Sequence, residues 1–250
     1  MLHPATNCLN CDNQLQENYC TSCGQKASTH RYSVKHFITH DFIHSVYHLD
    51  KGILFTIKQL LTRPGNSVRE FIQGKRVKYF SYITLIILLS GIGHFLSELS
   101  PVRLSDLGPE TSKMAMSALE KLSMEYPKLV TLFTIPFYTL FSYLSFRRAK
   151  MNGTEHLVMN TYKTAAELLI GIVFSSISIF YHNKEVLYLM FGFVGMLQSV
   201  YTVWFYYQYF SVYGYSRLQL LLRSILVLFL TFISIFIVSF ASGVMVLRKG

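Results

Sequence analysis

Five long apolar runs occupy the last two thirds of the chain, and they restrict its fold more than any other feature. The clearest run is Ser224–Leu247, SILVLFLTFISIFIVSFASGVMVL, which contains no charged residue. A helix needs about 20 apolar residues to cross a bilayer, and inside lipid it satisfies its backbone hydrogen bonds internally. The five runs cover residues 79–96, 129–146, 165–181, 186–210 and 224–247. The sequence therefore predicts an all-α integral membrane protein with about five transmembrane helices.

The composition agrees with a membrane protein and excludes an ordinary soluble domain. Hydrophobic residues make up 51% of the 250 residues and charged residues 14%, whereas soluble domains carry about 25% charged residues. The formal net charge is +10, but lysines and arginines cluster in the N-terminal third and at the ends of the apolar runs. This placement is typical of membrane topology and of contact with anionic headgroups, so we expect no nucleic-acid partner.

The distribution of lysine and arginine also predicts an orientation. With a cytoplasmic N-terminus and five spans, 16 of the 23 lysines and arginines fall on the cytoplasmic side, which is the side that these residues favour. Five spans place the basic C-terminal end outside, whereas four spans would place it inside and make one apolar run re-entrant. We expect three regions: a zinc-ribbon-like knuckle at residues 1–30, an amphipathic basic region at 31–78 and a transmembrane bundle at 79–250.

All four cysteines lie near the N-terminus in two Cys-x-x-Cys pairs, Cys8/Cys11 and Cys20/Cys23. Two such turns can aim four thiolates at one ion, which gives the closed tetrahedral shell of structural zinc. Disulfides are the competing interpretation, but the predicted cytoplasmic side is reducing. The spacing of the four cysteines differs from the patterns that are usual for iron–sulfur clusters. We therefore predict a structural Zn²⁺ site without catalysis at the metal, and Gly24 suits the tight turn after the last ligand.

Histidines recur at every fourth position in HFITHDFIHSVYH: His36, His40, His44 and His48. On a helix they lie opposite an apolar arc, so the segment is an amphipathic helix with a histidine face. The simplest interpretation is a solvated face of an interfacial helix. Two alternatives stay open: a second metal site formed by one His-xxx-His pair, with Asp41 or His30, and a pH-sensing face.

Three segments resemble the DUF3667 family, whose function is unknown and whose members occur mainly in Bacteroidetes: YCTSCGQK (19–26), DKGILFTIKQLLTRPGNSVREFIQGKRVKYFSY (50–82) and EHLVMNTYKTA (155–165). The resemblance implies a multi-pass bacterial inner-membrane protein with a CxxCG knuckle, but it implies no activity. Members often have a proline shortly after the Gly-Lys-Arg-x-x-Tyr element, where this chain has Ser81 and Tyr82. The histidine row gains no support from the family.

The second of these segments also has a physical interpretation. Residues 51–62 suit a short helix, Pro64 or Gly65 can open the next helix, and Gly74 can cap its C-terminal end. The basic residues that follow can fix the topology and contact anionic headgroups. The alternative is that these basic residues, together with Arg63 and Arg69, form a site for a phosphate-bearing ligand or a lipid headgroup. The candidate residues are Arg63, Arg69, Lys75, Arg76 and Lys78.

Few ionisable residues lie in or near the apolar runs, and such residues are functional candidates in a membrane. Glu155 and His156 precede the third run and Glu167 lies at its start, while Gln198 is the most polar group inside a run. Each ionisable group is close enough to an interface for solvation, so a structural role is also open. An aromatic belt at the interface explains the row Tyr201, Trp204, Tyr206, Tyr207, Tyr209, Tyr213 and Tyr215.

The sequence favours a non-enzymatic membrane protein whose knuckle and amphipathic helices form a cytoplasmic docking or regulatory surface. The partner would be a protein or anionic lipid. A small transporter or channel is one alternative, and it would need polar groups that face a common interior. A membrane-embedded enzyme that acts on a lipid is the other, and the scarcity of carboxylates in the runs argues against it.

Overall fold

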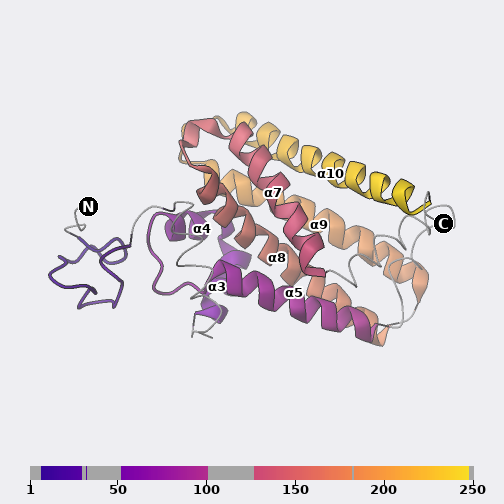
Figure 1. Ribbon diagram of the computed structural model, residues 1–250, viewed down its shortest axis with the longest axis horizontal. Helices are drawn as coiled ribbons and strands as arrows, with labels where there is room; N and C mark the ends of the chain where they lie inside the picture. The colour runs from indigo at the N-terminus through magenta and orange to yellow at the C-terminus, as the bar shows by residue number, and fades with distance from the viewer. Residues whose placement is uncertain (1–6, 30–31, 33–51, 101–126, 182, 248–250) are drawn as a thin grey trace.

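The computed structural model describes residues 7–29, 32, 52–100, 127–181 and 183–247 (Figure 1). The described part is all-helical apart from two isolated β-bridges, Asn7 with Gln14 and Tyr19 with Lys26. Its helices are α3 (Ile53–Thr62), α4 (Pro64–Ile72), α5 (Tyr82–Leu99), α7 (Pro127–Ser145), the short η3 (Arg147–Ala149), α8 (Gly153–Phe180), α9 (Lys184–Phe210) and α10 (Arg217–Leu247). The all-α prediction is confirmed.

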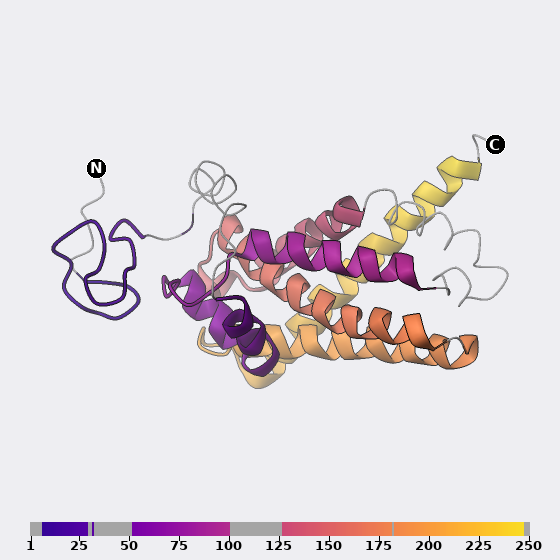
Figure 2. The same ribbon diagram turned by 90° about the horizontal axis from the view of Figure 1, so that it is seen from below.

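Helix α8 lies at the centre of the bundle. It packs against α5, α7 and α9, and α10 packs against α7 and α9. The helices alternate in direction: α5, α8 and α10 begin at the end of the bundle that carries the N-terminal knuckle, and α7 and α9 run back toward it (Figures 1 and 2). Towards its C-terminal end, α10 diverges from the other helices (Figure 2).

Four of the described helices are long and apolar enough to cross a membrane: α5, α8, α9 and α10 through Val238. Helix α7 covers the predicted second span, contains Pro136 and lies in the same bundle. The described helices thus agree with the expected membrane architecture: four are long and apolar enough to span, and α7 packs beside them.

Side-chain caps explain where two of these helices begin. Asn152 accepts a hydrogen bond from the backbone N–H of Glu155, and the Glu155 carboxylate accepts one from the N–H of Asn152. This reciprocal capping box starts α8 at Gly153, whereas the apolar run predicted a start at residue 165. Asn183 likewise accepts from the N–H of Val186 at the start of α9. The early start of α8 brings Glu155, His156 and Lys163 into the bundle.

Helices α3 and α4 form a short layer at the knuckle end of the bundle, where they contact α8 and α9 (Figure 1). Pro64 is the first residue of α4, as predicted, because its fixed φ and missing N–H suit that position. An aromatic cluster joins the layer to α5 and α8: the Phe71 ring lies 5.0 Å from the ring of Tyr162, and the Tyr82 ring lies 5.8 Å from it. The layer is therefore part of the same core.

Candidate functional site

The four cysteines lie on two equivalent turns that repeat every 12 residues. In the first turn the N–H of Asp12 donates to the carbonyl of Cys8, and in the second the N–H of Gly24 donates to that of Cys20, both at 2.8 Å. Asp12 and Gly24 have φ of 63° and 75°, in the left-handed region that glycine adopts without strain and aspartate more readily than most residues. The predicted role of Gly24 in a tight turn is confirmed, and Asp12 has the same role.

The four sulfur atoms converge on one point. All lie within 4.8 Å of one another, with Cys8 Sγ 3.6 Å from Cys23 Sγ and Cys11 Sγ 3.5 Å from Cys20 Sγ. In a tetrahedral ZnS₄ site with bonds of about 2.3 Å, the sulfurs are about 3.8 Å apart. The backbone N–H groups of Cys23 and Ser22 lower the pKa of the Cys20 thiol to about 7, whereas burial and the neighbouring thiols raise the pKa of Cys11 to about 12. The thiolate form, which binds metal, is thus favoured at Cys20 first. The cluster therefore fits a metal ion.

The knuckle contacts the end of α4 at two points. Leu9 packs so closely on Gly74 that a Cβ atom there would lie 2.7 Å from Leu9 Cδ1. The buried side chain of Gln25 accepts a hydrogen bond from the Arg76 N–H at 3.3 Å. The Arg76 guanidinium in turn lies 4.0 Å from the centroid of the Tyr32 ring, a favourable cation–π geometry. Residues that follow α4 thus hold the cysteine cluster against the bundle.

Helix α4 is fixed to the C-terminal end of α9. The Arg69 guanidinium donates to the carbonyls of Gln208 and Tyr209 at 2.9 and 2.8 Å and to Asn66 Oδ1 at 2.8 Å. The final carbonyls of a helix have no partner within it and carry partial negative charge, so a guanidinium is well placed there. Arg69 therefore joins two elements, and its donors are directed at protein oxygens.

A tyrosine hydroxyl likewise joins α3 to α9. Tyr201 of α9 donates to the carbonyl of Leu60 in α3 at 2.9 Å, and it is buried. Tyr206 and Tyr209 are buried as well. The aromatic-belt interpretation is wrong for these three residues, because they face the protein interior, whereas an interfacial belt faces headgroups.

The remaining basic candidates differ in exposure. Arg63 is exposed and forms an ion pair with Glu70, and Arg76 is half-buried by its contact with Tyr32. Lys75 and Lys78 are exposed. The structure therefore leaves Lys75 and Lys78 exposed, whereas Arg69 joins α4 to α9.

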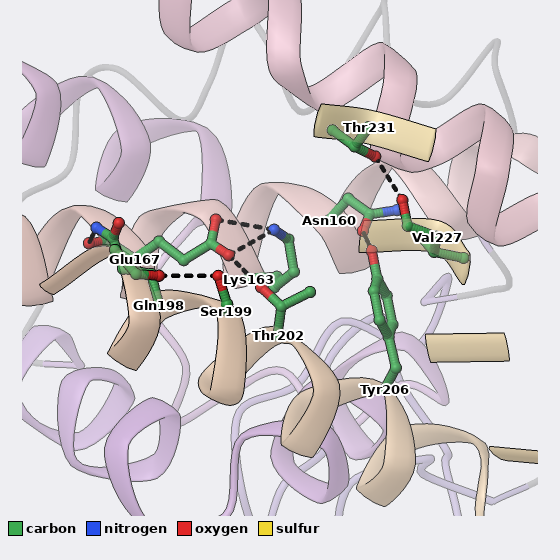
Figure 3. A network of polar contacts seen from close by, with 10 residues as sticks. Asn160, Lys163, Glu167, Gln198, Ser199, Thr202, Tyr206, Val227 and Thr231 are labelled. Atoms are coloured by element: carbon green, nitrogen blue, oxygen red, sulfur yellow. Dashed lines mark hydrogen bonds and ion pairs between the residues drawn. The ribbon is translucent and has the colours of Figure 1, made fainter. Parts of the chain in front are cut away.

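A buried ion pair lies inside the bundle. Lys163 Nζ is 2.8 Å from both carboxylate oxygens of Glu167, one turn further along α8 (Figure 3). Thr202 Oγ1 donates to the same carboxylate, and Gln198 Nε2 donates to the Glu167 carbonyl at 2.9 Å. Lys163 Nζ also lies 3.2 Å from the centroid of the Tyr138 ring. Charged groups at such positions are costly in a membrane protein and are functional candidates.

A second polar chain lies closer to the knuckle. Ser142 Oγ is 3.0 Å from His156 Nδ1 and accepts from Asn160 Nδ2 at 3.0 Å. Tyr206 donates to Asn160 Oδ1 at 2.6 Å (Figure 3). The His156 ring is enclosed by Tyr143 and Phe210, with ring centroids 5.7 and 6.0 Å away. This chain satisfies buried polar groups and joins α7, α8 and α9.

The predicted intramembrane candidates are thus placed in different roles. Glu155 belongs to the cap of α8, His156 to the buried chain with Ser142, and Glu167 to the ion pair. Sequence reasoning did not single out Lys163, Asn160 or Tyr138, and it placed Tyr206 only in the aromatic row. The spacing of Lys163 and Glu167, four residues apart, was the available signal, because such pairs meet on one face of a helix. The histidine row His36, His40, His44 and His48 lies outside the described residues.

Residues 50–92 match the family model described as "Protein of unknown function (DUF3667)". The chain carries a DUF3667 segment. This segment, defined as residues 50–92, includes α3, α4 and the first part of α5, and it contains Arg69, Gly74 and Arg76, which contact α9 and the knuckle. Comparisons with curated proteins and with solved structures find no match. The expected family resemblance is confirmed for the DUF3667 segment.

Proposed function

We propose that this chain is a non-enzymatic, multi-pass protein of the bacterial inner membrane, whose DUF3667 segment and zinc knuckle form a cytoplasmic docking surface for anionic lipid. The observation that carries the proposal is the outer face of α3. Leu54 and Leu61 are 78% and 48% exposed there, and the exposed Lys58 lies between them on the same face. Residues at these spacings line one side of a helix.

Such a face is suited to the boundary between acyl chains and headgroups. The leucines can enter the acyl region while the lysine ammonium reaches the headgroups. Beyond α4, the exposed Lys75 and Lys78 flank Val77, which is 46% exposed. Three lysines are therefore presented beside apolar side chains on the same segment. The opposite side of that segment is fixed to the bundle by Arg69 and Tyr201.

The knuckle would be the part of this surface that a zinc ion folds. Residues 7–29 are too few to bury a core, so a structural metal would supply their folding energy. The contacts of Leu9 with Gly74 and of Gln25 with Arg76 would then hold the folded knuckle against the lipid-binding segment. A protein partner is the second occupant that this surface could accept.

The test compares lipid retention by native mass spectrometry after purification from mixed micelles of phosphatidylglycerol and phosphatidylcholine. The variant carries Lys58→Gln, Lys75→Gln and Lys78→Gln. Each lysine near an anionic surface contributes about 1 kcal/mol, or about fivefold in affinity. We expect wild type to retain phosphatidylglycerol preferentially and the variant to lose most of that preference.

The matched control is Lys184→Gln, an exposed lysine at the start of α9, at the opposite end of the bundle. It removes a charge without touching the DUF3667 segment, so its lipid preference should equal that of wild type. Equal retention of phosphatidylglycerol by the triple variant and wild type would rule out lipid docking through these lysines.

A further inference from the structure

We propose that a crevice between α5, α8 and α9 is the entrance to a binding site for an alkali-metal cation, which competes with Lys163 for the carboxylate of Glu167. This inference does not depend on lipid docking at the DUF3667 segment. It rests on the crevice, on the ion pair at its inner end, and on the different exposure of the two charged partners.

The crevice has a volume of about 320 Å³, which is ample for an ion and several waters. Its polar lining consists of Ser97, Ser100, Ser175, Ser178, Gln198 and Glu167. Ser100 and Ser178 lie at the ends of α5 and α8 that are remote from the knuckle, so the mouth is at that end of the bundle. From Ser178 to Glu167 the crevice follows α8 for about 16 Å, at 1.5 Å per residue.

Two glycines, Gly93 and Gly171, line the crevice and add no side chain to it. A Cβ atom at Gly171 would lie 3.7 Å from Gln198 Nε2, and one at Gly93 would lie 3.7 Å from Ile172 Cγ1. Both distances are ordinary contacts, so the backbone at these positions does not require glycine. A larger side chain at Gly171 would instead project into the crevice beside Gln198.

The two partners of the ion pair differ in access. The Glu167 side chain is 14% exposed and lines the crevice, whereas the Lys163 side chain is fully buried. The carboxylate is therefore the partner that a solute in the crevice can reach. The carboxylate oxygens of Glu167, its backbone carbonyl oxygen and the hydroxyl oxygen of Thr202 lie near this point, and oxygen ligands are those that hard cations prefer. Every polar side chain that lines the crevice is neutral or anionic.

The net charge of the site determines what must accompany binding of the cation. The pair of Lys163 and Glu167 is neutral overall, and an added cation would leave one uncompensated charge in a low-dielectric interior, which is costly. The balanced step is an exchange. The cation binds the Glu167 carboxylate, one N–H bond of the Lys163 ammonium breaks, and the proton passes by way of a Glu167 carboxylate oxygen, which lies 2.8 Å from Lys163 Nζ, to water in the crevice. The amine that remains lies against the Tyr138 ring, and the net charge of the site is unchanged.

The groups around the pair are compatible with this exchange. Tyr138 faces it from α7, and Thr202 and Gln198 face it from α9. Tyr201 and Tyr206 are the further titratable groups of α9 nearby, and α5 contributes the hydroxyl of Ser97 to the crevice. Phenols and hydroxyls are uncharged near neutral pH, so Lys163 and Glu167 are the pair that can exchange a proton for a cation.

The experiment measures proton release from detergent-purified protein in weak buffer, with a pH-sensitive dye, after addition of NaCl, KCl or choline chloride. We expect NaCl or KCl to release up to about one proton per chain and choline chloride to release none. Glu167→Gln and Lys163→Met should abolish the release, whereas the exposed pair Glu185→Gln and Lys184→Met should release protons as wild type does. Equal release with choline, or no release with either alkali salt, would refute the proposal.

A second pair of variants keeps both charged residues and tests the route. Gly171→Leu fills the crevice, while Gly192→Leu adds the same side chain to α9 where no atom lies within 4 Å of the new Cβ. We expect Gly171→Leu to slow proton release at least tenfold and Gly192→Leu to leave it unchanged, with the same gel-filtration profile. Unchanged release in a folded Gly171→Leu protein would show that the crevice is not the entrance.

Discussion

Gly65 lies where the backbones of α4 and α9 come closest. Its N–H donates to Gln208 Oε1 at 3.2 Å, and a Cβ atom at this position would lie within 2.6 Å of backbone atoms of Tyr209 and Phe205 and of Gln208 Cβ. From the sequence, this glycine was interpreted as part of a helix start. The structure adds a packing reason: only hydrogen fits between the two helices. A sequence motif of this kind cannot reveal its distant partner, because α9 is about 140 residues further along the chain.

Replacement of Gly65 by alanine should therefore displace α4 from α9. Overpacking of a tight contact costs about 1–3 kcal/mol, and here the displaced atoms include backbone, which relaxes less readily than a side chain. We expect a lower midpoint of thermal unfolding in detergent for Gly65→Ala. The control is Gly195→Ala, for which nothing lies within 4 Å of the new Cβ. Equal unfolding midpoints for the two variants would contradict the close approach.

Ionisable residues show a similar division between what sequence can and cannot predict. Glu167 was a candidate because a carboxylate in an apolar run is unusual. Its partner Lys163 precedes the apolar run that begins at residue 165, because hydropathy places the start of this helix too late. The reciprocal cap of Asn152 and Glu155 was the local signal that would have corrected this start. The cation–π contact of Lys163 with Tyr138 needed the packing of α7 on α8, which no local pattern contains.

At the scale of elements, the knuckle is the most autonomous part of the described chain. Its two turns repeat the same backbone hydrogen bonds, and its contacts with the rest include Leu9 on Gly74 and Gln25 on Arg76. The repeat was visible in the sequence as two Cys-x-x-Cys pairs 12 residues apart, although the sequence could not show that Asp12 takes the place of Gly24. Local spacing is informative here because the four cysteines that converge lie close along the chain.

Loss of the proposed zinc ion should unfold the knuckle and spare the bundle. A structural zinc ion supplies about 10–16 kcal/mol of apparent folding energy in small zinc domains, while the bundle core does not include the cysteines. For Cys20→Ser combined with Cys23→Ser, we expect loss of one zinc per chain by elemental analysis. Amide hydrogen exchange of residues 7–29 should become fast, with helical circular dichroism almost unchanged.

Ser22→Ala is the control, because it changes the same turn without removing a sulfur. It should keep its zinc and its slow exchange. A zinc equivalent that survives the two cysteine changes would mean that other residues bind it, and it would direct attention to the histidine row.

At the scale of the whole molecule, the long helices alternate in direction, and this decides which end of the bundle each connecting segment occupies. The basic residues of η3 and the start of α10 lie at the knuckle end, close to the DUF3667 segment. Arg147 and Arg148 of η3 are exposed there. Both the predicted cytoplasmic regions and the bundle geometry thus place these cations on one side, which is the distribution that orients membrane proteins. Hydropathy predicted about five spans, and four of the described helices are long and apolar enough to cross a membrane. The lateral order of the helices, with α8 at the centre, depends on contacts between distant residues.

This arrangement predicts that the two ends of the chain face opposite sides of the membrane. Helix α10 begins at the knuckle end and its C-terminal end lies at the far end of the bundle (Figure 1), so a cytoplasmic knuckle requires an external C-terminus. In a bacterial host, alkaline phosphatase fused after Gly250 should be active, because it folds only outside the cytoplasm, and green fluorescent protein fused there should be dark. The same fluorescent protein fused after Gly214, between α9 and α10, should fluoresce. A fluorescent fusion after Gly250 would instead require an even number of crossings, with α7 or another helix that does not span, and would favour the four-span alternative.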